Sequence, residues 1–330
     1  MYAPAAGRGA AGSPAAVRRG AGILTGVPAA PVRYQSAEED SGRWEGFPFR
    51  PGDIVISTRS KTGTTWVQMI CALLIFQTPE LPAQLGSLSP WLDHTIAPRE
   101  EVVALLEAQQ HRRFIKTHTP LDGIPVDPRA TYLVTARHPL DMIVSLIHQG
   151  DNIDRAAVRR LTGQPEPPPP SPAPAAPPRP LRERVLRWID RDSDPREDMD
   201  GLPGLMWHLR DAWARRGEPN VLLIHYDNLS ADLDGQMRWL AGRLGIDVPA
   251  QAWPELIQAA TFESMRSRAS QVVPSPAVLK SSAAFFRRGT SGAGRELLTA
   301  GELSRYHARV AELAPPDLLA WLHAPGGQAG

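Results

Sequence analysis

Short apolar runs alternate along this chain with longer stretches in which apolar residues recur at helical spacing. Strands alternating with helices favour an α/β fold, with a parallel sheet covered by helices on both faces. In such sheets ligands bind beyond the carboxyl ends of the strands, so we expect the chemistry in the residues after each strand. The pattern predicts strands at 54–56, 113–116, 131–136 and 221–226, and helices at 66–76, 101–110, 142–148, 205–214 and 233–244.

Two segments depart from this alternation. The first 40 residues are mainly Ala, Gly, Pro and Arg, with no acidic residue before Glu38, so we expect 1–43 to be a disordered tail. Between 165 and 180, 10 of 16 residues are proline, which excludes a helix or an interior strand there. We therefore predict one domain over 44–330, with a mobile Pro-rich insertion at about 155–182.

Composition excludes several classes of protein. The 330 residues include 36 basic and 35 acidic side chains, a balance that argues against a nucleic-acid partner held by a large basic surface. The single cysteine, Cys71, excludes a disulfide framework and a cysteine-built zinc site. No apolar run of transmembrane length is present. We expect a cytoplasmic protein with no membrane partner and no bound metal.

The loop after the first strand, residues 58–66, reads Thr-Arg-Ser-Lys-Thr-Gly-Thr-Thr-Trp and suits a phosphate. Gly63 allows close backbone approach, Lys61 adds a charge, and the following helix offers free amides at its N-terminus. A helix capped by a threonine behind a turn is the alternative interpretation. In a Walker A loop the lysine follows the glycine, and here it precedes Gly63, so a nucleotide triphosphatase is disfavoured. The hydroxyls that could also donate to the anion are those of Thr62, Thr64 and Thr65.

A lysine and a histidine stand two residues apart at the end of the second strand. Lys116 and His118 would point to the same side of an extended chain. A neutral histidine can take a proton from an alcohol, and a neighbouring lysine can stabilise charge on a transferred group. A histidine that hydrogen-bonds only within its own loop is the competing interpretation.

The third and fourth strands lead into further anion-binding candidates. Arg137 can clamp a phosphate with two hydrogen bonds, and Ser145 can add a hydroxyl donor; a surface ion pair of Arg137 with Asp141 is the alternative. Tyr226 precedes Asp227, which taken alone could belong to a Walker B strand. Candidates from the C-terminal part are Phe262, which could equally be a core residue, and the Arg287-Arg288-Gly289 clamp.

These motifs together resemble the cytosolic sulfotransferase family. That family shows Tyr-Pro-Lys-Ser-Gly-Thr-Thr-Trp at the first loop and Phe-Ile/Val-Lys-Thr-His-Leu-Pro at the second. At the third it shows Arg-Asn-x-Lys/Leu-Asp-x-x-x-Ser. Later come Tyr-Glu-Asp-Met/Leu, an aromatic that packs on adenine, and Arg-Lys-Gly. The similarity runs from about residue 44 to about residue 313, interrupted by the Pro-rich insertion. It implies a P-loop-like α/β domain and an enzyme that moves a sulfuryl group.

The resemblance also implies a donor and a role for each motif. The donor is 3′-phosphoadenosine 5′-phosphosulfate (PAPS), and the acceptor is a hydroxyl or amine of a small molecule such as a phenol, an alcohol or a natural-product scaffold. His118 is the implied general base, with Lys61 and Lys116 at the reacting group. The remaining implied donor-binding residues are Thr62, Gly63, Thr64, Thr65 and Trp66 at the 5′-phosphosulfate, Arg137, Ser145, Arg287, Arg288 and Gly289 at the 3′-phosphate, and Tyr226 and Phe262 at the adenine.

The chain departs from the family pattern at several points. Arg59 and Ser60 replace Tyr and Pro, His138 replaces Asn, and Gly-Asp-Trp is missing after Gly289. The family dimerisation segment is not recognisable, so the oligomeric state stays open. A non-catalytic protein of the same fold, or less favourably a kinase-like phosphotransferase that needs magnesium, are the competing functions. Candidates for the acceptor pocket are Trp91, His148 and the stretch 150–202.

The basic residues are divided unevenly, into 33 arginines and 3 lysines. Lys61 and Lys116 fall in the two loops on which the proposed chemistry depends, whereas Lys280 has no role in it. A compact ammonium group is not interchangeable with a planar guanidinium. The division therefore points to the two loops as the reactive part of the chain.

Overall fold

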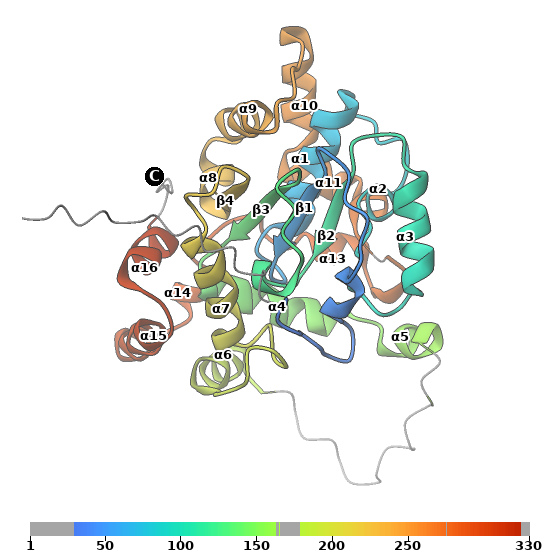
Figure 1. Cartoon of the computed structure of the whole chain (residues 1–330). Coiled ribbons are helices and arrows are strands. Elements are labelled where there is room, and N and C mark those ends of the chain that lie inside the picture. The colour runs from blue at the N-terminus through green and yellow to red at the C-terminus, as the bar shows by residue number, and fades with distance from the viewer. Residues whose placement is uncertain (1–29, 163–164, 166–178, 275, 325–330) are drawn as a thin grey trace, which may run out of the picture. The chain divides into compact units, whose positions relative to one another are not determined.

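The computed structural model describes residues 30–162, 165, 179–274 and 276–324 (Figure 1). The described residues from Pro31 onward form one compact unit. No helix among its described residues has both the length and the apolar character needed to cross a membrane.

Four parallel strands form the central sheet, in the order β2-β1-β3-β4. Every strand residue is buried except two that are half-buried, as expected for a sheet covered on both faces. The predicted parallel sheet and its strand positions are confirmed to within two residues. The strands are β1 (Ile54–Thr58), β2 (Phe114–Thr117), β3 (Thr131–Ala136) and β4 (Val221–His225).

Alternate residues of the strands face two separate apolar layers. Ile54 and Ile56 of β1 pack on one side and Val55 on the other, because successive side chains of a strand point to opposite faces. The first layer contains α1 (Thr64–Phe76), α9 (Leu233–Leu244), α10 (Trp253–Ala259) and α11 (Phe262–Ser267). The second contains Trp44, α3 (Arg99–Ala108) and part of α7 (Leu202–Ala214).

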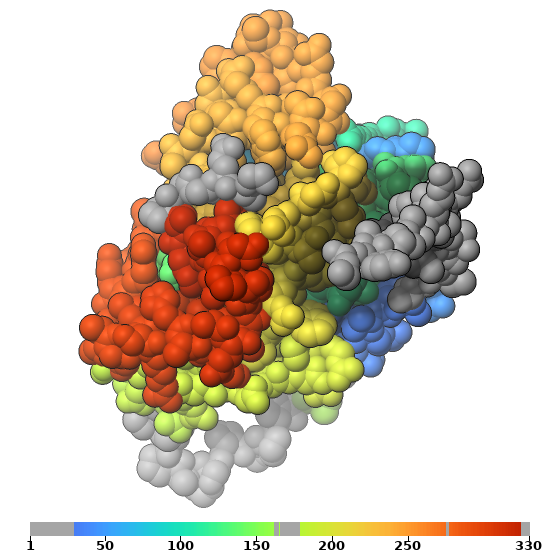
Figure 2. All heavy atoms as spheres, turned by 60° about the vertical axis from the view of Figure 1, so that its left-hand side comes forward, coloured from blue at the N-terminus to red at the C-terminus, as the bar shows by residue number. Residues whose placement is uncertain are grey.

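A third apolar cluster lies beside the sheet, against the other side of α7. Figure 2 shows α15 and α16 in red on the surface next to the yellow-green segment that includes α6 and α7. The helices of this cluster are α4 (Pro139–Asn152), α6 (Leu181–Asp190), α15 (Ala300–Leu313) and α16 (Pro316–His323). The shorter helices of the unit are η1 (Ser41–Trp44), α2 (Leu85–Leu88), η2 (Leu121–Gly123), α5 (Arg155–Thr162), α8 (Tyr226–Ala231), η3 (Ala250–Ala252), α12 (Ala269–Val272), η4 (Pro276–Val278), α13 (Ser282–Phe285) and α14 (Ala293–Glu296).

The compact unit begins at Pro31, ahead of the predicted tail boundary at residue 43. Tyr34 and Trp44 are fully buried, and the amide of Val32 donates to the carbonyl of Asp122 at 2.8 Å. Within the predicted tail, Tyr34 supplies buried aromatic surface that the Ala- and Pro-rich composition did not indicate. The rest of the expected tail, residues 1–29, lies outside the described residues.

The predicted insertion at 155–182 is too wide. Its first part is the helix α5, and α6 begins at Leu181, before the predicted end. The amphipathic α6 buries Val185, Trp188 and Ile189. Of the Pro-rich run at 165–180, residues 166–178 lie outside the described residues.

Candidate active site

The loop between β1 and α1 has the conformation of an anion cradle. Gly63 has a φ of 117°, and Lys61 has a φ of 63°, which is rare for a residue with a side chain. The Thr62 hydroxyl braces the turn, lying 2.7 Å from the Arg59 carbonyl oxygen, to which it donates, and 2.9 Å from the Thr135 hydroxyl. Among the described residues no side chain caps α1 at its N-terminus, so its first amides are free to meet an anion.

The ammonium group of Lys61 lies over an aromatic ring at the mouth of this loop. Its Nζ is 3.7 Å from the centroid of Phe285, a residue of α13. Burial lowers the pKa of Lys61 to about 7, and the charges of Arg137 and Lys116 act in the same direction. An anion placed here would restore the charged form of Lys61, because an opposite charge raises the pKa of a lysine.

Lys116 and His118 lie against the same indole ring. The Nζ of Lys116 is 3.6 Å from the centroid of Trp91, and the His118 ring meets Trp91 edge-on at 4.6 Å. The predicted juxtaposition of the two side chains is therefore present. Burial lowers the pKa of Lys116 to about 8, although the carboxylates of Glu39 and Asp93 oppose that shift. Trp91, a candidate for the acceptor pocket, thus touches the proposed base and its neighbouring cation.

His118 is held in one orientation and in its neutral form. Its Nδ1 is hydrogen-bonded to the carbonyl oxygen of Thr58. Since a carbonyl can only accept, Nδ1 carries the hydrogen and Nε2 keeps its lone pair. Burial, followed by the charges of Lys116 and Arg59, lowers the pKa of His118 well below its usual value. The ring can therefore accept a proton at Nε2 at neutral pH.

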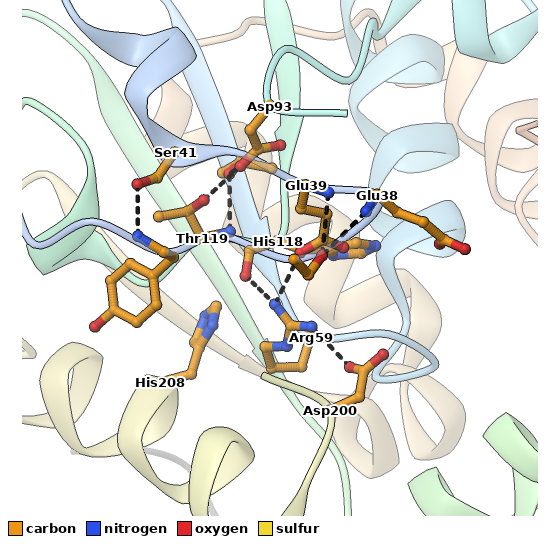
Figure 3. Close-up of polar contacts among 12 residues, drawn as sticks. Glu38, Glu39, Ser41, Arg59, Asp93, His118, Thr119, Asp200 and His208 are labelled. Atoms are coloured by element: carbon orange, nitrogen blue, oxygen red, sulfur yellow. Dashed lines mark hydrogen bonds and ion pairs between the residues drawn. The ribbon is translucent and has the colours of Figure 1, made fainter. Parts of the chain in front are cut away.

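A buried arginine, which the sequence pattern did not single out as functional, lies beside the base. Arg59 is 2% exposed and donates to the main-chain carbonyl of His118 (Figure 3). The same guanidinium forms an ion pair with Asp200 at 2.8 Å and faces Glu39 at 3.6 Å. The one sequence signal that could have found it is its departure from the family tyrosine.

A row of three side chains lies next to the anion cradle, in the spatial order Arg137, Tyr226 and Trp66. The Arg137 guanidinium lies 4.1 Å from the Tyr226 ring centroid, and the Tyr226 and Trp66 rings meet edge-on at 5.2 Å. A Cβ on Gly63 would approach the Tyr226 ring to 3.2 Å, so this glycine also permits close packing. Arg137 donates to the Thr290 carbonyl at 3.1 Å, while its buried Nε has no hydrogen-bond partner among the described residues.

The segment after α13 closes this side of the site. Gly289 has a φ of 70°, and a Cβ there would approach the Phe262 ring to 2.6 Å. The Asp141 carboxylate accepts from the amides of Gly292 and Gly294 at 2.8 and 2.9 Å. Asp141 thereby anchors the stretch in which the family Gly-Asp-Trp is missing.

The remaining candidates lie around α4 and the arginine pair. Burial lowers the pKa of Arg287, and the positive charges of Arg288 and Arg137 act in the same direction. Arg288 is exposed, and Ser145 is half-buried on α4. His138, which replaces the family asparagine, accepts from the Leu140 amide at 3.2 Å and so caps α4.

Fold and site together define a parallel α/β group-transfer enzyme, with an anion cradle after one strand and a buried neutral histidine after its neighbour. A family model described as the sulfotransferase domain matches residues 51–314. The chain belongs to the sulfotransferase family, as the motifs predicted, and it is a sulfotransferase enzyme.

Two relatives and one solved structure illustrate the similarity. Over 310 residues the chain is 42% identical to a glycolipid sulfotransferase of Mycobacterium bovis, covering 88% of this chain and 94% of the relative. A glycolipid sulfotransferase of Mycobacterium tuberculosis is also 42% identical, over 309 residues, with the same two coverages. The structure of retinol dehydratase in a complex with retinol and PAP matches with a TM-score of 0.60 at 19% identity, covering 82% of this chain and 83% of that one. The P-loop-like α/β fold predicted from the motifs is confirmed.

Proposed function

We propose that this enzyme transfers the sulfuryl group of PAPS to a hydroxyl group of a glycolipid acceptor. The observation that carries the proposal is the neutral His118, with its Nδ1 bound to the Thr58 carbonyl and its ring beside Lys116. This base follows the strand next to the one that leads into the anion cradle. Transfer of a group from a bound anion to an alcohol requires a base close to the anion site, and adjacent strands place the two together here.

The residues around the cradle fit the anionic groups of PAPS. The free amides of α1 and the ammonium of Lys61 suit the 5′-phosphosulfate. The 3′-phosphate is proposed to bind Arg137 and the Arg287-Arg288 pair, with Ser145 as a further donor. The buried Nε of Arg137 has no hydrogen-bond partner among the described residues. When bound, PAPS supplies the sulfuryl group. The rings proposed to lie at the adenine are Tyr226 and Phe262, and the loop residues proposed at the 5′-phosphosulfate are Lys61, Thr62, Gly63, Thr64, Thr65 and Trp66.

The acceptor side is proposed to work through two side chains. Nε2 of His118 takes the proton of the acceptor hydroxyl, which makes its oxygen a better nucleophile. The ammonium groups of Lys116 and Lys61 stabilise negative charge that develops during the transfer. Positioning and electrostatics account for the proposed catalysis.

The glycolipid acceptor is taken from the two mycobacterial relatives, both named glycolipid sulfotransferase. The ring of Trp91, which contacts Lys116 and His118, offers an apolar surface for the acceptor. A phenol, an alcohol or a natural-product scaffold, the acceptors that the family resemblance implies, is the alternative within the same reaction.

The test is incubation with PAPS and a panel of glycolipids, phenols and aliphatic alcohols, with products identified by the mass of one added sulfuryl group. We expect transfer to at least one glycolipid. Lys61→Ala and His118→Ala should each lower turnover by at least about 1,000-fold while the protein stays folded. Lys280→Ala, which changes an exposed lysine that donates to the Asp151 carbonyl, is the matched control and should keep wild-type turnover.

Three outcomes would contradict the proposal. Full turnover in Lys61→Ala or His118→Ala would exclude their roles. Binding of the desulfonated nucleotide without transfer to any acceptor would favour a non-catalytic protein, and a thermal-shift measurement detects such binding. Phosphoryl transfer that is lost on adding a chelator would favour a kinase-like enzyme.

A further inference from the structure

We propose that Arg59 is a positioning residue for the base His118, and that Glu39 and Asp200 hold Arg59 in place. The inference rests on the proposed function of His118 and adds three residues from distant parts of the chain. Glu39 lies in the packed N-terminal segment, Arg59 follows β1, and Asp200 precedes α7. Figure 3 shows all three around the loop that carries His118.

Two hydrogen bonds in opposite directions join the end of β1 to His118. The Nδ1–H of His118 donates to the carbonyl of Thr58, and the side chain of Arg59, the next residue, donates to the carbonyl of His118. The first bond fixes the orientation of the ring, and the second fixes the backbone from which the ring projects. Loss of the Arg59 bond would leave a base that is present but poorly placed, and small displacements of a catalytic group are costly.

Arg59 needs partners because a fully buried guanidinium without counter-charges is strongly destabilising. The ion pair with Asp200 at 2.8 Å supplies one, and Glu39 at 3.6 Å supplies the other. One oxygen of Glu39 is buried without a hydrogen-bond partner among the described residues. Burial raises the pKa of Glu39 to about 7, while the charge of Arg59 opposes that shift, so Glu39 supplies its full counter-charge only above neutral pH. The backbone of Glu39 forms a β-bridge with His94, which stacks on Trp91 at 4.1 Å.

The positive charge of Arg59 also affects the pKa of the proposed base, His118. The charged or titratable groups that face His118 are Lys116 on β2, Arg59, and His208 on α7. The positive charges of Lys116 and Arg59 add to burial in lowering the pKa of His118, which keeps Nε2 unprotonated. Carboxylates of Glu39, Asp93 and Asp200 face Arg59 itself. Removing the Arg59 charge should therefore raise the pKa of His118 and shift the acid limb of kcat/KM to higher pH.

The experiment compares Arg59→Gln, Arg59→Lys, Asp200→Asn and Glu39→Gln with the wild type, using PAPS and the best acceptor of the panel. In Arg59→Gln we expect kcat to fall about 100-fold, the acid limb to move to higher pH, and the Kd of the desulfonated nucleotide to stay within about threefold. Arg59→Lys should return the acid limb towards its wild-type position. It should recover only part of kcat, because an ammonium cannot match the two-sided contacts of a guanidinium. Asp200→Asn and Glu39→Gln should each lower kcat about tenfold, without weakening nucleotide binding.

The control is Arg33→Gln, which removes an exposed arginine of the same N-terminal segment, paired with Asp40 at 2.6 Å. It should behave as the wild type. If Arg59→Gln keeps the wild-type kcat and acid limb, the inference is wrong. If both Arg59 variants fail to fold, wild-type kcat in both Asp200→Asn and Glu39→Gln overturns it. A wild-type enzyme that transfers no sulfuryl group fails the proposed function instead, so the two failures are distinguishable.

Discussion

The three lysines differ in what their ammonium groups contact. The ammonium groups of Lys61 and Lys116 each lie over an aromatic ring, at 3.7 and 3.6 Å; Lys61 is half-buried and Lys116 is buried. Lys280, which had no role by sequence, donates to the Asp151 carbonyl at 2.7 Å, near the C-terminal end of α4. Such a contact satisfies a helix terminus and is favoured by the helix dipole. Two lysines therefore have surroundings suited to chemistry, and the third has a structural role.

The lowered pKa values of Lys61 and Lys116 predict a pH profile. Both lysines must be charged to act, and their pKa values of about 7 and about 8 mean that the free enzyme loses these charges as pH rises. We expect kcat/KM for PAPS to fall as pH increases through this window. The alkaline limb of kcat should lie at higher pH, because bound anions favour the charged lysines.

Initial rates over a pH series test this prediction, with Lys61→Arg as the comparison. An arginine stays charged throughout, so this variant should lose the limb that belongs to Lys61, even at reduced overall activity. Identical alkaline limbs for kcat and kcat/KM would contradict the assignment.

Gly289→Ala is predicted to weaken nucleotide binding. A Cβ at this positive-φ position would come within 2.6 Å of the Phe262 ring, so both the backbone and the ring must shift. We expect the Kd of the desulfonated nucleotide to rise at least about tenfold, a loss of about 1.4 kcal/mol. Titration calorimetry measures it, and Gly301→Ala, at a helical glycine with open space around the added Cβ, is the control. An unchanged Kd would remove Phe262 from the adenine site.

At the scale of elements, the apolar pattern predicted all four strands of the described residues, because each is a continuous apolar run, and it predicted α1, α3, α4, α7 and α9. It missed α15, which is as long as α4. It missed α6, although Val185, Trp188 and Ile189 have helical spacing, because the neighbouring prolines dominated the interpretation of that region. It also missed the packing of the segment from Pro31 to residue 43, whose buried Tyr34 stands alone in a sequence without periodicity.

Asp141 is expected to control the order of the segment that follows Gly289. Its carboxylate accepts from the amides of Gly292 and Gly294, and hydrogen bonds to a charged group contribute about 1.5–3 kcal/mol each. Asp141→Ala should raise KM for PAPS at least about tenfold and lower the free energy of unfolding by about 2–4 kcal/mol. Denaturant unfolding and steady-state kinetics measure both, and Asp234→Ala, which removes an exposed helix ion pair with Arg238, is the control. A change in stability with KM unaltered would separate this segment from the donor site.

At the scale of the whole molecule, the motifs located the groups of the site that follow one another closely in sequence. Lys61 with Gly63, and Lys116 with His118, are local patterns that a single chain displays. The surroundings of Arg59 are not local: His118 is 59 residues away and Asp200 is 141 residues away. No spacing rule links such positions, because the fold brings together the ends of β1 and β2 and the segment before α7.

The packed N-terminal segment leads to a prediction about truncation. Trp44 packs edge-on against Phe47 at 5.3 Å, and the Tyr34 hydroxyl donates to Asp122 at 2.8 Å and accepts from Trp207 at 2.6 Å. Removing residues 1–30 leaves all these contacts in place, so this variant should keep the wild-type melting temperature and kcat. Removing 1–44 also deletes Trp44, whose loss alone should cost about 3–5 kcal/mol.

The longer truncation should lower the melting temperature strongly. At a temperature where this variant stays folded, its kcat should also be below that of the wild type, because Glu39 no longer faces Arg59. Tyr34→Phe separates the two effects. It removes the hydroxyl contacts of the segment without touching Glu39, so it should reduce stability by about 1–2 kcal/mol with little change in kcat. Wild-type stability and kcat after removal of 1–44 would show that the segment is dispensable for the fold and for the base.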